Sequence, residues 1–220
     1  MLEQKVSEGT LSMITVHHLN NSRSQRIVWA LEELGAEYEI AQHTRDTETG
    51  LAPESLTKIH PLGKAPVLVD GDVTIAESGA AVDYLARTYG GGKFAPAYDS
   101  PEYLKYNELM HYVEGSAMLP LILSLYVRRL GEAGAPLGPR IMSEIGLHLG
   151  QLARTLGAQP FFMGDQISAV DFHATFVLEA ANAGGALAKI PNLAAYLARM
   201  EDRPAYKRAI ERGGEYKLGS

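Results

Sequence analysis

The feature that most constrains the fold is an apolar β-hairpin that begins directly after a proline. Pro66 precedes two apolar runs, and Asp70-Gly71, a dipeptide typical of tight hairpin turns, lies between them. Because proline lacks the N–H that a central strand must donate, Pro66 is predicted at a strand start or at a sheet edge, where an extended peptide can pair. The second run leads to Glu77 and Ser78 at the start of a helical pattern, and a helix start can bind a carboxylate.

Composition places the chain among globular proteins. Its 220 residues are 46% hydrophobic and 21% charged, which is enough for one large core or two small ones. The formal charge of −6 argues against a general affinity for nucleic acid or an anionic membrane, because those partners attract basic surfaces. Since residues 1–12 lack the apolar core of a signal peptide and no stretch is long and apolar enough to span a membrane, we expect a cytoplasmic protein.

The chain contains no cysteine, which excludes disulfides, thiolate nucleophiles and cysteine metal ligands together. Any thiol chemistry must therefore use a thiol that the ligand provides. His17 and His18 are neighbours in a predicted strand, so their side chains should point to opposite faces. With no second cluster at ligand spacing, we expect no metal site.

The first part of the chain alternates strand and helix patterns. The predicted elements are a strand over 14–19, a helix from about Arg23, a strand over 38–41, a short helix over 53–59, the hairpin over 67–75 and a further helix. This order of βαβ, helix and ββα is that of a thioredoxin-like domain. We assign the domain to residues 13–89 and expect residues 1–12 to be a disordered extension.

After this domain the composition changes. A glycine run and two prolines mark a linker, assigned to 90–99, and residues 100–220 are predicted to form an all-helical domain. Ser100 and Pro101 are predicted to cap and open its first helix, which Pro120 should kink or break. Further helices are expected over 139–156, 169–183, 191–200 and 204–212.

One helix start in the second half is specified in detail. Ser168 and Asp171 have the spacing of a capping box, and Ile167 with Phe172 can form the hydrophobic staple that often accompanies one. We interpret this block as a structural cap without chemistry of its own.

Together these motifs resemble the glutathione S-transferase superfamily over residues 14–212. The proline-led hairpin, the carboxylate-binding helix start and the capping block occur in the family's order. The segments Asn20–Arg26 and His111–Met118 look most like the bacterial and fungal members related to the first yeast glutathione transferase. The resemblance implies a thioredoxin-like domain followed by an all-helical domain, a homodimer, and glutathione as the co-substrate.

The resemblance also implies which residues contact glutathione. Ala65 precedes what is normally a cis proline, so the backbone N–H and C=O beside Pro66 would pair with the cysteinyl backbone of glutathione. Ser78 and the nearby helix N–H groups would bind the γ-glutamyl carboxylate, while Glu77 would attract the γ-glutamyl ammonium.

A basic side chain is expected at the glycyl end of glutathione. Lys64 could neutralise that carboxylate, and His43 or Arg45 could do the same work. The sequence leaves these alternatives open.

Catalysis in the resembled family requires an ionised thiol, and the turn before the first helix offers suitable donors. Asn21, Ser22 and Ser24 all lie in this turn. Alignment with the family places Ser22 where serine-type members place their thiolate donor, with Asn21 as the alternative. Either side chain could instead serve only as a helix cap.

The second substrate would be a hydrophobic electrophile bound between the domains. The face of the broken helix that carries Tyr112, Ser116, Met118 and Tyr126 is the expected location. The leading hypothesis is a transferase whose thiolate attacks an electrophile or a peroxide. The alternatives are a glutathione-binding scaffold without turnover and a glutathione-dependent lyase or isomerase of aromatic catabolism, because fold alone does not separate these functions.

Overall fold

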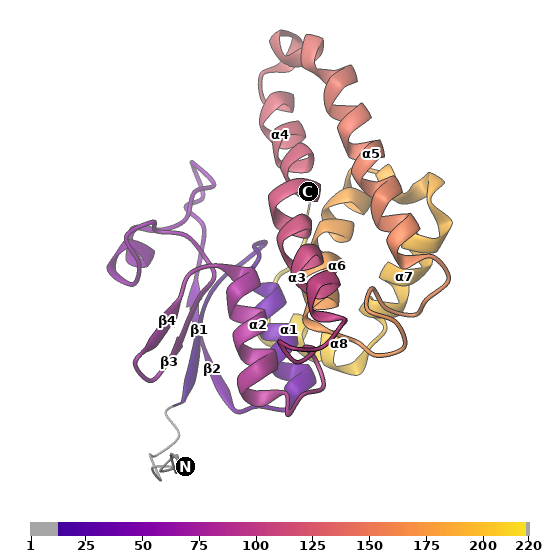
Figure 1. Ribbon diagram of the computed structural model, residues 1–220. Coiled ribbons are helices and arrows are strands. Elements are labelled where there is room, and N and C mark those ends of the chain that lie inside the picture. Colours follow the sequence, from indigo (N-terminus) through magenta and orange to yellow (C-terminus); the bar gives the residue numbers. More distant parts are fainter. Residues whose placement is uncertain (1–12, 219–220) are drawn as a thin grey trace, which may run out of the picture.

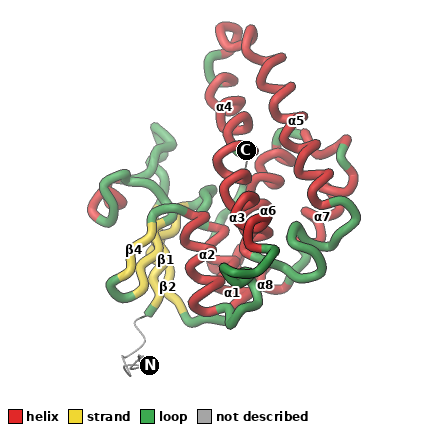
Figure 2. Tube along the Cα trace, viewed as in Figure 1, coloured by secondary structure: helices red, strands yellow, loops and turns green. Residues whose placement is uncertain are grey.

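The computed structural model describes residues 13–218, so the predicted extension over 1–12 lies outside the described residues. The first part of the described chain follows the predicted order, and its strands gather there, as Figure 2 shows. The elements are β1 (Ile14–Leu19), α1 (Gln25–Leu34), β2 (Tyr38–His43), the 3-10 turn η1 (Glu54–Lys58), β3 (Val67–Asp70), β4 (Val73–Ile75) and α2 (Ser78–Tyr89).

The strands of the described residues form one mixed, four-stranded sheet in the order β2-β1-β3-β4. β1 pairs in parallel with β2 and antiparallel with β3, where His17 lies opposite Val67. β3 and β4 form the predicted hairpin. Pro66 directly precedes β3, an interior strand, so the strand start is the position that the proline takes. Helices α1 and α2 lie between the sheet and the helical half (Figure 1), and the thioredoxin-like domain is confirmed.

The second half of the described chain is helical, as predicted. Its elements are α3 (Tyr103–Tyr112), the π-helical turn η2 (Val113–Ala117), α4 (Leu119–Arg128), η3 (Gly131–Leu137), α5 (Gly138–Leu156), α6 (Ala169–Ala183), η4 (Ala186–Lys189), α7 (Pro191–Glu201) and α8 (Pro204–Gly213). In Figure 1, α4 and α5 extend beyond the rest of the molecule.

Prolines shape the first helices of this half in two ways. Pro120 lies in the first turn of α4, and the π-helical turn η2 joins α4 to α3, so the predicted break is confirmed. The predicted cap at Ser100 is wrong, because α3 begins at Tyr103 and the Ser100 carbonyl accepts the Tyr103 N–H at 3.1 Å. A serine before proline suits a β-turn as well as a helix start, and the local sequence does not distinguish the two.

The capping block at the start of α6 forms as predicted. Asp171 accepts the backbone N–H of Ser168 at 2.8 Å, and the reciprocal bond completes the capping box. The same carboxylate accepts the N–H of Phe162 at 3.1 Å and the hydroxyl of Tyr196 at 2.8 Å. Asp171 therefore connects α6 to the preceding loop and to α7, which is a structural role.

An apolar core joins the two halves around α1. The ring of Trp29 packs edge-on against Phe172 of α6 and Tyr206 of α8, with centroids 5.0 and 5.4 Å apart. Arg203 at the start of α8 forms an ion pair of 2.5 Å with Glu33 of α1. Helix α1 is thus held from both sides, which positions the turn at its N-terminal end. Within residues 13–218, no helix is both long and apolar enough to cross a membrane.

Candidate functional site

The strand register brings the predicted contact segments to one end of the sheet. β1 ends directly before the turn over 20–24. β3 runs antiparallel to β1 and begins directly after Pro66, so Pro66 lies at the same end. β4 ends beside the start of β3 and leads into Glu77 and Ser78. Segments that are far apart in the sequence therefore meet at a single edge.

The turn before α1 has a constrained backbone. Asn21 has a φ of 53°, in the left-handed region that asparagine tolerates better than most residues. The guanidinium of Arg45 donates to the carbonyls of Asn20 and Asn21 at 3.2 and 3.1 Å. Arg45 therefore supports the turn. Helix α1 begins at Gln25 rather than at about residue 23, because a tighter turn precedes it.

The two candidate thiolate donors have different partners. Ser22 is 8% exposed, and its hydroxyl oxygen accepts the Ser24 N–H at 3.2 Å and lies 2.7 Å from the Ser24 hydroxyl. The amide oxygen of Asn21 accepts the backbone N–H of Lys217 at 2.5 Å. The Ser22 hydroxyl proton and the Asn21 amide nitrogen are the donors that either residue could present to an anion.

The hairpin start has the backbone geometry that the resemblance implies. The Ala65–Pro66 peptide bond is cis, Ala65 is half-buried and Pro66 is buried. Lys64 next to them is exposed. The ring nitrogens of His43 lie 3.1 Å from the His17 ring and 3.0 Å from a serine hydroxyl of η1, so His43 is already hydrogen-bonded.

The start of α2 combines several groups that favour an anion. Ser78, the first residue of the helix, is 4% exposed, whereas Glu77 before it is exposed. The Ser78 hydroxyl oxygen accepts a hydrogen bond of 2.8 Å from Nη1 of Arg26. Because a guanidinium only donates, Ser78 keeps its own proton for another acceptor. That proton, the helix N–H groups and the nearby cation together can bind a carboxylate.

Arg26 connects this helix start to the helical half. It is 1% exposed, and Glu114 of η2 accepts hydrogen bonds of 2.7 Å from both Arg26 and Arg23. The guanidinium of Arg26 lies 4.8 Å from the ring centroid of Phe176. Burial acts to raise the pKa of Glu114, but the two arginines hold it below its ordinary value. The buried cation is thus compensated by a carboxylate from the other half of the molecule.

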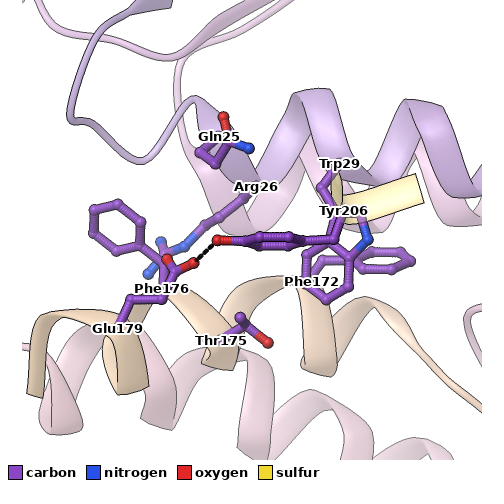
Figure 3. A pocket seen from close by; sticks show the side chains of 8 residues that line it. All are labelled: Gln25, Arg26, Trp29, Phe172, Thr175, Phe176, Glu179 and Tyr206. Carbon is purple, nitrogen blue, oxygen red and sulfur yellow. Dashed lines mark hydrogen bonds between the residues drawn. The ribbon is translucent and has the colours of Figure 1, made fainter. Parts of the chain in front are cut away.

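A buried carboxylate of α6 lies near Arg26. Figure 3 shows Glu179 of α6 accepting a hydrogen bond from the hydroxyl of Tyr206. The hydroxyl of Tyr216, in the segment after α8, donates to Glu179 at 2.5 Å. Burial raises the pKa of Glu179 to about 7. The segment after α8 is therefore anchored here and reaches the α1 turn through the contact of Lys217 with Asn21.

A cavity of about 390 Å³ adjoins the start of α2. It lies between α2 and α3, and its lining includes Glu77, Asp83, Glu114 and His173. Asp83 is paired with Arg87 of the same helix at 2.9 Å. Glu114 is likewise paired, with Arg23 and Arg26, so the exposed carboxylate of Glu77 is the group of this lining that favours a cation.

The residues predicted to line the electrophile site differ in their exposure. Tyr112 lies 2.8 Å from the ring of His148, and Met118 is 3% exposed, so both residues pack within the helical half. Tyr126 is 58% exposed, and the neighbouring Leu119 of α4 is 62% exposed. Accessible apolar surface in this segment is therefore provided by α4.

His17 and His18 point to opposite faces, as predicted. His18 is 2% exposed and contacts Ser24, whereas half-buried His17 contacts His43. Among residues 13–218, the structure brings together no group of three or more histidine, cysteine, aspartate or glutamate side chains suited to a metal ion. The expectation of a metal-free protein stays a prediction.

Sequence reasoning missed Arg26 and Glu114. A signal for Arg26 exists, because it precedes Trp29 and Ala30 by three and four residues and so shares their buried helix face. A cation on such a face requires a partner. The partner is 88 residues away, and no local pattern marks Glu114 for this role.

The fold places a cis-proline hairpin and the starts of two helices at one end of a thioredoxin-like sheet, beside an all-helical half. Residues 11–87 match the glutathione S-transferase N-terminal domain, and residues 140–212 match the glutathione S-transferase C-terminal domain. The chain belongs to the glutathione S-transferase family.

Relatives support this assignment along most of the chain. Glutathione S-transferase 3 of Schizosaccharomyces pombe is 36% identical, over 91% of this chain and 88% of its own length. Glutathione S-transferase 1 of Saccharomyces cerevisiae is 34% identical over 58% of this chain and 56% of its own length. The predicted resemblance to fungal members is confirmed.

Solved structures agree with the fold. A glutathione S-transferase from Actinobacillus pleuropneumoniae superposes with a TM-score of 0.83 at 35% identity and covers 91% of this chain and 93% of its own. A glutathione S-transferase from Methylobacterium radiotolerans, crystallised with glutathione sulfonate, has a TM-score of 0.75 at 22% identity and covers 94% and 97% of the two chains. The second likeness shows the fold alone.

Proposed function

We propose that this chain is a glutathione transferase that ionises the thiol of bound glutathione at Ser22. The observation that carries the proposal is the strand register, which brings the α1 turn, cis-Pro66 and Ser78 to one end of the sheet. An extended tripeptide placed along this edge could pair with the backbone beside Pro66. It would also lie next to the starts of α1 and α2. The matches to the N-terminal and C-terminal domains of glutathione S-transferases support the choice of ligand.

The γ-glutamyl end of glutathione is assigned to the start of α2. Ser78 donates its hydroxyl proton to the carboxylate, and Arg26 behind it adds a permanent positive charge. Glu77 is exposed at the edge of the cavity between α2 and α3 and attracts the ammonium. The cysteinyl backbone pairs with the N–H and C=O of Ala65, directly before the cis Pro66.

Lys64 is assigned to the glycyl carboxylate. Its two alternatives already have partners, since Arg45 holds the α1 turn and His43 is bonded to His17. Lys64 is exposed, so its contribution is small and depends on salt.

The energy needed to ionise the thiol is within reach of the α1 turn. A free thiol has a pKa of about 8.5, and lowering it by about two units requires about 2.7 kcal/mol of stabilisation of the anion. A hydroxyl that donates to an anion contributes about 1.5 to 3 kcal/mol. The N-terminal end of a helix adds roughly 0.3 to 1 kcal/mol. Ser22 and the start of α1 therefore suffice, and Asn21 is the alternative donor.

The thiolate then attacks a hydrophobic electrophile at carbon, or a peroxide at oxygen. The accessible apolar residues of α4 support the helical half as the wall of that second site. Which of these reactions runs is decided by the electrophile, and a panel of conjugation and peroxide substrates identifies it. A protein that binds glutathione and turns over none of them would be the scaffold instead.

Titration of the bound thiol tests the central assignment. The ultraviolet absorbance of the thiolate is followed against pH in the parent protein, in Ser22→Ala and in Asn21→Ala. We expect Ser22→Ala alone to move thiolate formation to higher pH, while glutathione affinity at low pH stays near that of the parent. An unshifted curve in Ser22→Ala with a raised curve in Asn21→Ala would move the role to Asn21.

A two-fold homodimer and a cytoplasmic location complete the proposal. The dimer rests on the resembled family, and its two subunits are expected to meet through self-complementary surfaces. Light scattering at micromolar concentration checks it, and a strictly monomeric mass would contradict it. Fractionation of the producing cells checks the location.

A further inference from the structure

A buried chain of three side chains lies behind the hydroxyl of Ser22. Its Oγ lies 2.7 Å from Oγ of Ser24, which in turn lies 2.9 Å from Nδ1 of His18. Ser22 is 8% exposed, Ser24 is fully buried and His18 is 2% exposed. The chain therefore runs from the proposed thiol site into the interior, and both of its links have hydrogen-bond length.

The far side of the His18 ring meets helix α8. A Cβ placed on Gly213 would lie 3.3 Å from Nε2 of His18, and the backbone of Gly213 forms a hydrogen bond that favours the protonated ring. Such a bond means that Nε2 carries a proton and donates it to the backbone. In the neutral ring Nδ1 is then an acceptor, and it lies within hydrogen-bond distance of the Ser24 hydroxyl.

The surroundings of His18 keep the ring neutral in the free protein. Burial lowers the pKa of His18 to about 4, against the raising effect of the Gly213 backbone, and His43 on β2 lowers it further. The other neighbours are uncharged, because α1 presents Ser24 and α8 presents the backbone of Gly213, with Gln25 also against that glycine.

The hydroxyl of Ser24 has two acceptors within reach, Nδ1 of His18 at 2.9 Å and the carbonyl of Leu19 at 3.1 Å. Ser22 Oγ accepts the N–H of Ser24, and Ser24 Oγ accepts the N–H of Leu19. In the arrangement that allows a proton relay, Ser22 donates to Ser24 and Ser24 donates to His18. If Ser22 donates its proton to a sulfur anion instead, Ser24 can donate its own proton to Ser22 across the 2.7 Å between their hydroxyl oxygens. A lone pair of Ser24 Oγ then faces Nδ1 of His18. A proton on Nδ1 would restore the hydrogen bond between Ser24 and His18.

We propose that His18 accepts, through Ser24 and Ser22, the proton that the bound thiol releases. The S–H bond breaks and its electron pair stays on sulfur. Ser22 takes that proton as it passes its own to Ser24, and Ser24 passes its own to Nδ1 of His18. The products are a thiolate and an imidazolium, with every hydroxyl now donating towards the sulfur, and neither an oxidant nor a reductant is needed. This inference rests on the proposed role of Ser22.

The coupling between the two charges works in both directions. A thiolate at Ser22 raises the pKa of His18, and an imidazolium at His18 lowers the pKa of the thiol by the same free energy. A glutathione whose sulfur carries a methyl group cannot ionise, so it should occupy the site without changing His18. This ligand separates the effect of the negative charge from the effect of filling the site.

Nitrogen-15 magnetic resonance of the imidazole rings tests the inference. In the parent protein with glutathione, the thiolate absorbance near neutral pH should be accompanied by the signal of a protonated Nδ1 on His18. At higher pH this nitrogen should lose its proton while the thiolate remains. In the free protein and with S-methylglutathione, Nδ1 should be unprotonated near neutral pH. The measurement on the parent protein needs no variant to fold, and the spectrum of His18→Gln serves only to assign the signal.

Variants supply a second readout. Ser24→Ala and His18→Gln should each raise the pKa of the bound thiol by about three units, up to a thousandfold loss of thiolate near neutral pH, because the same coupling must bring the pKa of His18 from about 4 to about 7. His17→Gln, in the same strand but on the opposite face, should leave it unchanged. A thiolate complex with unprotonated His18 and with unshifted Ser24→Ala would overturn this inference and leave the role of Ser22 intact. A glutathione complex without thiolate at any accessible pH would overturn both.

Discussion

The starts of α1 and α2 use the same residue type, a buried serine, with opposite kinds of support. Ser78 at α2 is held by Arg26, a permanent cation that is 1% exposed. Ser22 before α1 is held by Ser24, which leads to His18, a ring whose pKa is lowered to about 4. One serine thus has a fixed charge behind it, and the other has a neutral base.

The difference follows the chemistry of the two groups that we propose to bind there. A carboxylate is already an anion at neutral pH, so a permanent cation gives the attraction required. A thiol must first lose a proton, and a permanent cation cannot accept one. A neutral imidazole that is linked to the thiol by hydroxyls can accept that proton. We therefore expect ligand binding at the start of α1 to depend on pH and binding at the start of α2 to be independent of it.

The largest expected effect comes from removing the carboxylate that compensates Arg26. Glu114→Ala leaves the cation buried with one partner fewer, and we expect the free energy of unfolding to fall by about 3 to 5 kcal/mol. Urea unfolding measures this. Glu144→Ala removes a carboxylate of similar exposure from Arg140, whose side chain is 77% exposed, and from a 3.7 Å contact with His148, and should cost at most about 1 kcal/mol. Equal losses in the two variants would show that burial of Arg26 does not matter.

The second largest effect is expected from the pH dependence of stability, which should reveal the neutral His18 behind Ser22 but not the permanently charged Arg26 behind Ser78. The pKa of His18 is 6.5 in the reference state and about 4 in the folded protein, so the unfolded chain binds the proton more tightly. Stability is therefore fully present above pH 6.5 and is lost as the pH falls towards 4, by about 3 kcal/mol. Comparing urea unfolding of the parent and His18→Gln over this pH range isolates the contribution of His18 to the free energy of unfolding. The two proteins should lose different amounts of stability, and parallel curves would count against a strongly lowered pKa.

Glutathione binding should depend more on the α2 start than on the α1 start. Ser78→Ala removes a hydrogen bond to a charged group, typically about 1.5 to 3 kcal/mol, so affinity should fall roughly tenfold or more. Calorimetry with S-methylglutathione should give the same loss, since the γ-glutamyl contacts do not involve the sulfur. Glu77→Ala is expected to weaken binding in the same direction. Parent-like binding by both variants would remove the γ-glutamyl assignment.

The smallest effect is expected at the glycyl end. Lys64 is exposed, so Lys64→Met should lower glutathione affinity by at most about 1 kcal/mol. The loss should disappear at high salt, where exposed charges are screened. Lys58→Met, an exposed lysine of η1, is the matched control. A large, salt-independent loss in Lys64→Met would mean that this end of the ligand is buried like the γ-glutamyl end.

Local sequence was sufficient for the elements and for several contacts of the site. Asp70-Gly71 predicts the hairpin, Pro66 predicts a strand start, and Ser168 with Asp171 predicts the capping box, because each depends on residues within a few positions of one another. The cis bond at Pro66 came from the family resemblance and is present. The cap expected at Ser100 failed for the same reason, since two local structures suit the same few residues.

The sequence by itself determined the order of strands and helices, the proline-led hairpin and the candidates Ser22, Glu77 and Ser78. Tertiary structure alone decided what stands behind these residues. The Arg26 and Glu114 contact spans 88 residues, and the contact of Asn21 with Lys217 spans 196. The order of hydroxyls from Ser22 to the His18 ring also depends on how α1 and α8 pack against β1. Propensities and spacing report only on neighbours along the chain, whereas the charge, burial and proton of a side chain depend on neighbours in space.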